Sequence, residues 1–152
     1  MRELDRGRVR FSELARRAAS ELVLPEGRRL HVYPDGGIVL DVDPHRMLQV
    51  LANLLQNAVR HGAGDLHLSC FREDAGAVIH VSDEGGGIER GFEDEVFLPF
   101  AHRSDRADST GLGLSIARAI VEAHGGQLLY LPPAAGRQHQ FVIVLPRPAD
   151  DR

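Results

Sequence analysis

The chain has 152 residues, 43% of them hydrophobic and 26% charged, which is the size and balance of one soluble globular domain. The formal net charge of −4 argues against a nucleic-acid partner, the single cysteine excludes an internal disulfide, and no apolar run approaches the roughly 20 residues that span a bilayer. All 18 basic residues are arginine, which excludes a lysine-bearing phosphate loop and Schiff-base chemistry.

The N-terminal third predicts one helix and two strands. Ser12 is the predicted N-cap of a short helix with apolar residues at helical spacing, which ends before Pro25. Residues 30–33 and 38–40 then predict two strands on either side of a turn at residues 34–37, which is the pattern of a hairpin.

The middle of the chain contains the strongest helical pattern. Asp43 is the predicted N-cap, Pro44 occupies the first helical position, and Gly62 ends the helix. Two strands are predicted after it, near residues 65–72 and 77–82.

The C-terminal part begins with an irregular, glycine-rich and acidic segment at residues 83–95. Another helix is predicted from about residue 113 to 124, where a glycine pair stops it. Strands near residues 127–131 and 140–145 complete the pattern.

The order of these elements predicts an α+β fold, a two-layer sandwich of a β-sheet packed against helices. No repeat or long linker divides the chain, so we expect residues 1–152 to form a single domain, with residues 1–10 and 147–152 frayed. The charged N-terminus is unlike a signal peptide, and a cytoplasmic location is expected.

Two asparagines mark one face of the central helix. Asn53 and Asn57 are four residues apart, which places their Cβ atoms roughly 6 Å from each other, and Arg60 and His61 extend this face. They could be ordinary polar residues on a solvated side. However, asparagine is a mediocre helix former, a neutral oxygen suits Mg²⁺, and Arg60 could bind phosphate through forked hydrogen bonds.

Asp83 ends a predicted strand directly before a run of glycines. The sequence there could be a simple surface turn, but the carboxylate could also accept a hydrogen bond from a purine amino group. Gly85 and Gly87 would then let the backbone approach a flat base closely. The run is not a dinucleotide-binding fingerprint, because Arg90 stands where the third glycine belongs.

Residues 109–116 lead through two glycines into the later helix. Backbone N–H groups at such a helix start can bind an anion, although many helices simply begin after a flexible segment. Before it, two phenylalanines flank a proline at residues 97–100, followed by a polar run. This pattern predicts an anchored lid at about residues 101–110, with the phenylalanines in the core rather than on a ligand.

Together these segments resemble the ATP-binding domains of two-component sensor histidine kinases, within the GHKL superfamily shared with DNA gyrase, the mismatch-repair ATPases and a heat-shock chaperone. The resemblance covers about residues 43–146. The matching motifs are the asparagine box at residues 53–61, the first glycine box at 83–88, the phenylalanine box at 96–100 and the second glycine box at 111–114.

The resemblance implies a mixed β-sheet against three helices, with ATP and Mg²⁺ between the central helix and the lid. By position, Asn57 would hold Mg²⁺, Asn53 would lie beside the triphosphate, and Asp83 would recognise adenine. The positions that match the family's nucleotide-binding residues are Asn53, Asn57, Arg60, His61, Asp83, Gly85, Gly87, Ile88, Phe100, Arg103, Thr110, Gly111, Leu112, Gly113 and Leu114.

Asn53 distinguishes this chain from the hydrolysing branches of the superfamily. Those relatives have a glutamate there that activates water, whereas an amide does not accept a proton near neutrality. We therefore expect phosphoryl transfer to a protein nucleophile, with Asn53, Asn57 and Arg60 acting by positioning and charge neutralisation.

The lid segment departs from the family pattern. Asp108 and Ser109 stand where a pair of glycines is usual, and a carboxylate there could weaken nucleotide binding. The basic residue expected after Phe100 could be either His102 or Arg103.

None of the eight histidines is followed by an acidic residue, as the family's phosphoacceptor histidine is. The acceptor is therefore expected on a separate dimerisation domain, in the same parent chain or in another subunit, with a response regulator downstream. No direct contact with a membrane or nucleic acid is expected. His124 is expected to interact with the end of the later helix.

Two alternatives remain open from the sequence. One is a serine kinase or binding module of the anti-sigma-factor type, which usually lacks such a complete phenylalanine box. The other is a non-catalytic nucleotide-binding domain.

Overall fold

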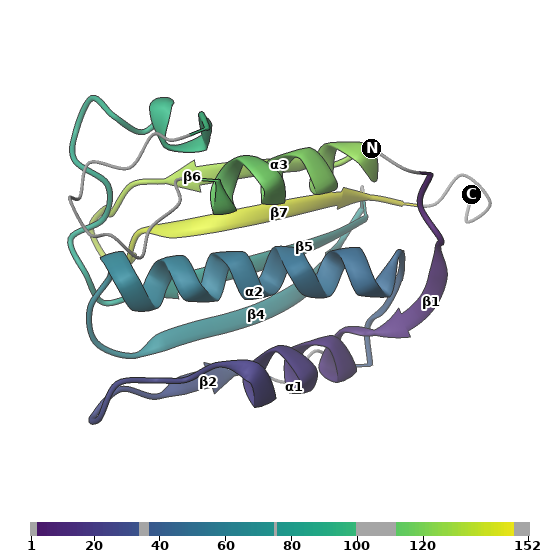
Figure 1. Cartoon of the computed structure of the whole chain (residues 1–152), viewed down its shortest axis with the longest axis horizontal. Coiled ribbons are helices and arrows are strands. Elements are labelled where there is room, and N and C mark those ends of the chain that lie inside the picture. Colours follow the sequence, from purple (N-terminus) through teal and green to yellow (C-terminus); the bar gives the residue numbers. More distant parts are fainter. Residues whose placement is uncertain (1–2, 34–36, 75, 100–111, 148–152) are drawn as a thin grey trace.

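The computed structural model describes residues 3–33, 37–74, 76–99 and 112–147 of the chain (Figure 1). The predicted lid at about residues 101–110 lies outside these ranges, and so do four of the predicted site residues. Those four are Phe100, Arg103, Thr110 and Gly111.

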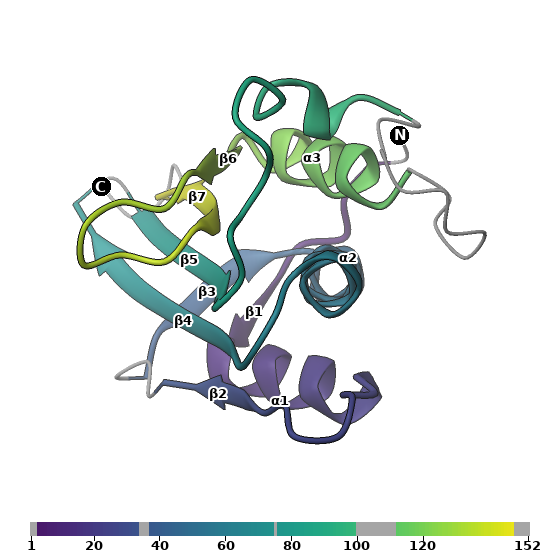
Figure 2. The same ribbon diagram turned by 90° about the vertical axis from the view of Figure 1, so that its left-hand side faces the viewer.

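A five-stranded mixed sheet and three helices form the two layers of the fold. The sheet has the order β2-β4-β5-β7-β6, and only the β2–β4 pair is parallel. The helices cover one face of the sheet, as Figure 2 shows, and the predicted α+β sandwich is confirmed. The strands of this sheet are β2 (Leu30–Val32), β4 (Leu66–Glu73), β5 (Gly76–Asp83), β6 (Gln127–Leu131) and β7 (Gln140–Pro146). The helices are α1 (Phe11–Glu21), α2 (Pro44–His61) and α3 (Gly113–Ala123), with a short 3₁₀ turn, η1 (Glu95–Phe97).

The central helix α2 forms as its sequence signals predict. The Asp43 side chain accepts a hydrogen bond from the Arg46 backbone N–H (3.1 Å), Pro44 fills the first turn, and Gly62 is the C-cap. The apolar stripe of α2 is buried between the sheet and the other helices. Its buried residues are Met47, Val50, Leu51, Leu54, Leu55 and Ala58.

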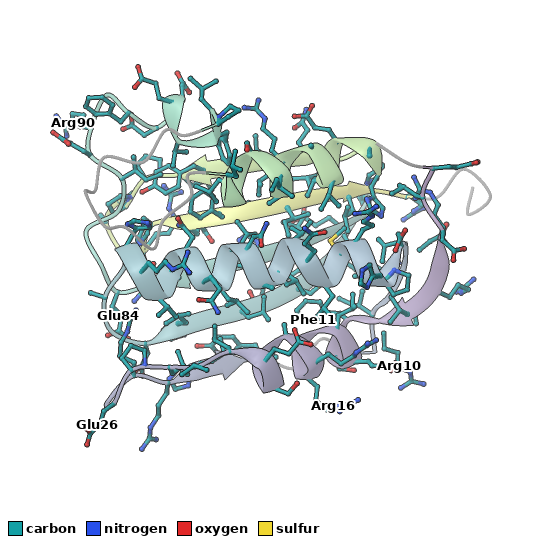
Figure 3. All side chains as sticks on the ribbon, in the orientation of Figure 1. Arg10, Phe11, Arg16, Glu26, Glu84 and Arg90 are labelled. Carbon is teal, nitrogen blue, oxygen red and sulfur yellow. The ribbon has the colours of Figure 1, made fainter. Side chains whose placement is uncertain are left out.

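The start of α1 differs from the prediction. The helix begins at Phe11 rather than after Ser12, and no side chain caps it. The Phe11 backbone N–H instead donates to the Ile38 carbonyl (3.0 Å), and the Phe11 ring is fully buried. Figure 3 shows Phe11 directed toward α2 and Arg16 away from it. A long-range backbone bond and core packing thus set the helix start.

The predicted N-terminal hairpin is also wrong, because its two strands join different sheets. β2 pairs in parallel with β4, whereas β3 (Val39–Val42) pairs antiparallel with β1 (Gly7–Arg10) in a separate two-stranded sheet. The expectation that residues 1–10 are frayed is therefore wrong for β1. Leu40 and Val42 alternate into the core, and this burial fixes the register of β3.

His124 joins the far ends of two helices. Its buried ring accepts the Asp43 backbone N–H at Nε2 (3.0 Å) and donates from Nδ1 to the Ile120 carbonyl (2.8 Å). The predicted contact with the end of α3 is confirmed, and the same ring also links α3 to the start of α2.

Within the described ranges, no helix is both long enough and apolar enough to cross a membrane.

Candidate functional site

Three segments far apart in the sequence meet at one end of the molecule. These are the C-terminal half of α2, the end of β5 and the start of α3 (Figure 1). Glu84 and Arg90, from the glycine-rich segment after β5, lie at the same end in Figure 3. The site is built from these pieces.

Asn53 connects α2 to the start of α3. Its side-chain Nδ2 donates to the Gly113 carbonyl at 3.0 Å. A carbonyl can only accept, so Nδ2 must be the atom that faces Gly113, and the amide oxygen of Asn53 remains for another donor or a cation. Helix α2 and Gly113 of the second glycine box are therefore in direct contact.

Asn57, Arg60 and His61 continue the Asn53 side of α2 toward its C-terminus. Asn57 is half-buried, whereas Arg60 and His61 are exposed. A half-buried asparagine near a solvent-accessible helix end fits Mg²⁺, which needs few protein ligands and completes its shell with water and phosphate oxygens.

Asp83 lies buried at the end of β5, against the C-terminus of α2. Its Oδ1 accepts from the backbone N–H groups of Gly85 (2.7 Å) and Ala63 (3.3 Å), and His139 Nε2 lies 2.8 Å from the same oxygen. Burial by itself raises the pKa of Asp83, but the His139 contact and the two amides together bring this pKa below its ordinary value. Asp83 is thus an ionised hydrogen-bond acceptor.

All three contacts to Asp83 from the described residues end on Oδ1. Oδ2 faces Gly62, where a Cβ atom would overlap it. Glycine at position 62 therefore makes room for the carboxylate, and Oδ2 is the oxygen available to a further donor, such as a purine amino group.

The start of α3 offers backbone donors. Leu112 is the N-cap, and no side chain caps the helix. The helix leaves the N–H groups of its first turn without partners inside the helix, and the Gly113 carbonyl that binds Asn53 belongs to this turn. The chemistry of this end suits phosphate oxygens. Leu114 is buried and anchors the turn to the core.

Phe97, the first phenylalanine of its segment, packs in the core. Phe97 is buried, meets Phe141 edge to face at 5.8 Å between ring centroids, and lies 5.1 Å from the Arg118 guanidinium carbon. The expectation that this phenylalanine serves the core is confirmed.

Arg28 secures the end of α2. Its guanidinium donates to the carbonyls of Val59 (3.0 Å) and Ala58 (3.2 Å) and to that of Gly64. Arg28 thus adds a charged donor to two of the last carbonyls of α2, one of which, that of Ala58, also accepts the Gly62 backbone N–H (3.0 Å).

Sequence reasoning missed His139 and Tyr130, which lie directly beside Asp83 and the first glycine segment. The Tyr130 hydroxyl is 3.2 Å from His139 Nδ1 and accepts the Ile88 backbone N–H at 2.8 Å. A signal did exist, because Phe141 and Ile143 alternate into the core, and this period of two places His139 on the same side of the sheet.

Residues 42–149 match the family of histidine kinase-, DNA gyrase B- and HSP90-like ATPases. The probable sensor histidine kinase TcrY of Mycobacterium tuberculosis is 39% identical over 135 residues, which are 84% of this chain and 28% of TcrY. This chain therefore corresponds to less than a third of that relative.

The structure is similar to the ATP-binding domain of PrrB from Mycobacterium tuberculosis, with a TM-score of 0.76 and 26% identity over 95% of this chain and 99% of that one. It is equally similar to part of full-length ShkA, solved in complex with AMPPNP, with a TM-score of 0.76 and 26% identity over 97% of this chain and 33% of ShkA. The chain therefore belongs to the family of histidine kinase-, DNA gyrase B- and HSP90-like ATPases, and it has the structure of a sensor histidine kinase ATP-binding domain.

Proposed function

We propose that this chain binds ATP with Mg²⁺ and transfers the γ-phosphoryl group to a histidine on a separate dimerisation domain or partner protein, for relay to a response regulator. The observation that carries the proposal is the Asn53–Gly113 hydrogen bond. It joins α2, which carries both asparagines, to the backbone N–H groups at the start of α3. A nucleotide placed there would meet Asp83 with its base and α3 with its phosphates.

Each proposed role follows from chemistry. Asp83 would accept the adenine amino group, and the N–H groups at the start of α3 would receive phosphate oxygens. Asn57 would hold Mg²⁺, which neutralises phosphate charge when bound, and Arg60 would add a cation at the exposed end of α2.

Asn53 supports transfer rather than hydrolysis. Its amide cannot act as a base for water, and Nδ2 is already engaged with Gly113. In the proposed reaction the bond from the γ-phosphorus to its bridging oxygen breaks, a phosphorus–nitrogen bond to the acceptor imidazole forms, and ADP leaves.

The relatives support the same assignment. ShkA was solved with AMPPNP, an ATP analogue, and TcrY is named a probable sensor histidine kinase. Because this chain spans only part of each, we place the acceptor histidine in another segment of the parent protein or in another subunit. ATP and response regulators are cytoplasmic, so we expect this domain to work there. The anti-sigma-factor alternative is not favoured by these relatives.

The test combines the purified chain, ATP labelled at the γ-phosphate, Mg²⁺ and a histidine-bearing dimerisation domain. We expect label on the dimerisation domain that is lost in acid and stable in base, as for phosphohistidine. Acid-stable label would indicate a serine kinase. Nucleotide binding without any transfer would indicate a non-catalytic domain.

A matched pair of variants tests the metal assignment by calorimetry. Asn57→Ala should abolish Mg²⁺-dependent nucleotide binding, measured by calorimetry, because the proposed ligand is lost. Gln49→Ala removes an amide from the same face of α2, about 12 Å and two turns away, and should bind as wild type does. Normal Mg²⁺-dependent binding by Asn57→Ala would show that another residue holds the metal.

A further inference from the structure

His139 and Asp83 form a buried pair where β5 ends and β7 begins, in the middle of the sheet. The side chain of His139 is 9% exposed and that of Asp83 is 4% exposed, and Nε2 lies 2.8 Å from Oδ1. The pairing of β5 with β7 ends at Ser82 and Gln140, so Asp83 and His139 continue that register by one residue and face each other on the helix-covered side.

The bonds around the ring are compatible with a proton on Nε2. The Ile88 N–H donates to the Tyr130 oxygen, and burial raises the pKa of Tyr130 above its ordinary value, so the hydroxyl keeps its proton at neutral pH. That proton can go to His139 Nδ1, which leaves the N–H of a neutral ring at Nε2, toward Asp83. A doubly protonated ring would also have an N–H at Nε2.

The glycine-rich segment closes over this pair. Gly87 has a φ of +85°, and a Cβ atom at this position would overlap the Tyr130 hydroxyl and lie 3.1 Å from the His139 Cβ. The segment can therefore pack directly onto Tyr130 and His139, and the Ile88 amide reaches the tyrosine oxygen.

Nε2 is buried, yet among the described residues no acceptor lies in line with its N–H. Buried polar atoms without an aligned partner are uncommon in proteins, and the contact that this nitrogen does make is the 2.8 Å approach to Asp83 Oδ1.

We propose that His139 is a positioning residue for adenine recognition: it holds Asp83 through Oδ1 so that Oδ2 is presented to the amino group of the base, and Tyr130 and Ile88 hold His139 in turn. This inference rests on the proposed function. Adenine carries an amino group where guanine carries a carbonyl, so a correctly held carboxylate accepts from ATP and repels GTP.

The experiment measures the affinities of ATP·Mg²⁺ and GTP·Mg²⁺ for the purified chain and its variants by calorimetry. His139→Leu removes the donor, and we expect its ATP affinity to fall about tenfold with little change for GTP. His139→Gln places an N–H near the Nε2 position and should restore most of the preference for ATP. His139→Asn, whose amide reaches only the Nδ1 position, should not.

His80→Leu is the matched control. His80 lies on β5 on the open face of the sheet, where its Nδ1 contacts Gln140, and its replacement should leave the ATP to GTP ratio unchanged. A general loss of stability would weaken both nucleotides equally and would not be rescued by glutamine. A wild-type ratio in His139→Leu, with ATP bound normally, would overturn this inference alone.

Failure of the wild-type chain to bind ATP would overturn the proposed function, and this inference with it.

A second measurement needs no variant. Long-range ¹H–¹⁵N correlation spectra of the imidazole report which nitrogen holds the proton. We expect a proton on His139 Nε2. A neutral ring protonated only on Nδ1 would contradict the proposal even if His139→Leu failed to fold.

Discussion

At the scale of single residues, Asp83 is a buried charged group held by several contacts at the candidate site. Two backbone amides and His139 converge on its Oδ1, and Gly62 leaves room for its Oδ2. The sequence identified Asp83 because a carboxylate at a strand end before glycines is an informative local pattern. The alternation along β7 could place His139 on the core side, but it could not identify the contact with Asp83, since that contact joins residues 56 positions apart and depends on the pairing of β5 with β7.

The lowered pKa of Asp83 predicts a pH dependence of stability. A carboxyl whose pKa is lower in the folded state stabilises the fold above its unfolded pKa, near 3.8, and loses that contribution as the pH falls through its folded value. At pH 7, Asp83→Asn should therefore lower the free energy of unfolding by about 1–2 kcal/mol.

Urea unfolding of both proteins at pH 7 and near pH 3 checks this prediction. The difference should shrink at the lower pH. Asp43, whose pKa is also lowered, is present in both proteins and cancels in the comparison. An equal difference at both pH values would mean that the charge of Asp83 is not what stabilises the fold.

Gly62→Ala should cost about 1–3 kcal/mol of stability, because the new methyl group would displace the Asp83 carboxylate or the end of α2. Nucleotide affinity should fall as well. Thermal unfolding and calorimetry measure the two effects. Gly7→Ala is the control, since nothing lies within 4 Å of the Cβ position at Gly7. Wild-type stability in Gly62→Ala would show that the carboxylate relocates at no cost.

At the scale of secondary-structure elements, features set by nearby residues could be predicted from the sequence, whereas features set by long-range contacts could not. The start of α2 was predictable because Asp43 and Pro44 act within one turn of the helix. The start of α1 was not, because the Ile38 carbonyl and burial of Phe11 decide it. The same reasoning explains the hairpin error. Residues 30–33 and 38–40 are neighbours in sequence, but β2 pairs with β4 and β3 pairs with β1.

We predict that the strand β1 contributes to the stability of the fold. Removing residues 1–10 should lower the free energy of unfolding by about 2–4 kcal/mol, since β3 would lose its partner strand and Asp43 would lose the bond from the Asp5 backbone N–H (2.9 Å). Removing residues 1–3 keeps both features, because Asp5 retains its peptide N–H, and should have little effect. Chemical denaturation compares the two, and equal stability after both deletions would contradict a structural role for β1.

At the scale of the whole molecule, one end holds the candidate site and the other is tied together by His124. The sequence predicted the convergence of α2, Asp83 and α3, because the order and spacing of the motifs resemble a known family. It could not supply the supporting contacts, such as Asn53 to Gly113, since these depend on how α2 and α3 pack. The roles expected for Phe100, Arg103, Thr110 and Gly111 stay predictions.

Ligand binding should raise the stability of the whole chain as a single unit. At ATP·Mg²⁺ concentrations about 100 times the dissociation constant, linkage adds about 2.7 kcal/mol, which corresponds to a rise of about 5–10 °C in the unfolding midpoint. Scanning calorimetry should show one transition that moves with nucleotide in the wild type and does not move in Asn57→Ala. Two separate transitions would contradict a single domain.

Arg28 has a consequence for the electrostatic potential at the nucleotide end. The last carbonyls of α2 give the C-terminus of this helix a partial negative charge, which disfavours anions near it. Because the Arg28 guanidinium binds two of these carbonyls, a full positive charge offsets the unfavourable pole of that helix. We therefore expect Arg28, which lies outside every recognised motif, to make this end of the molecule less repulsive to an anionic ligand.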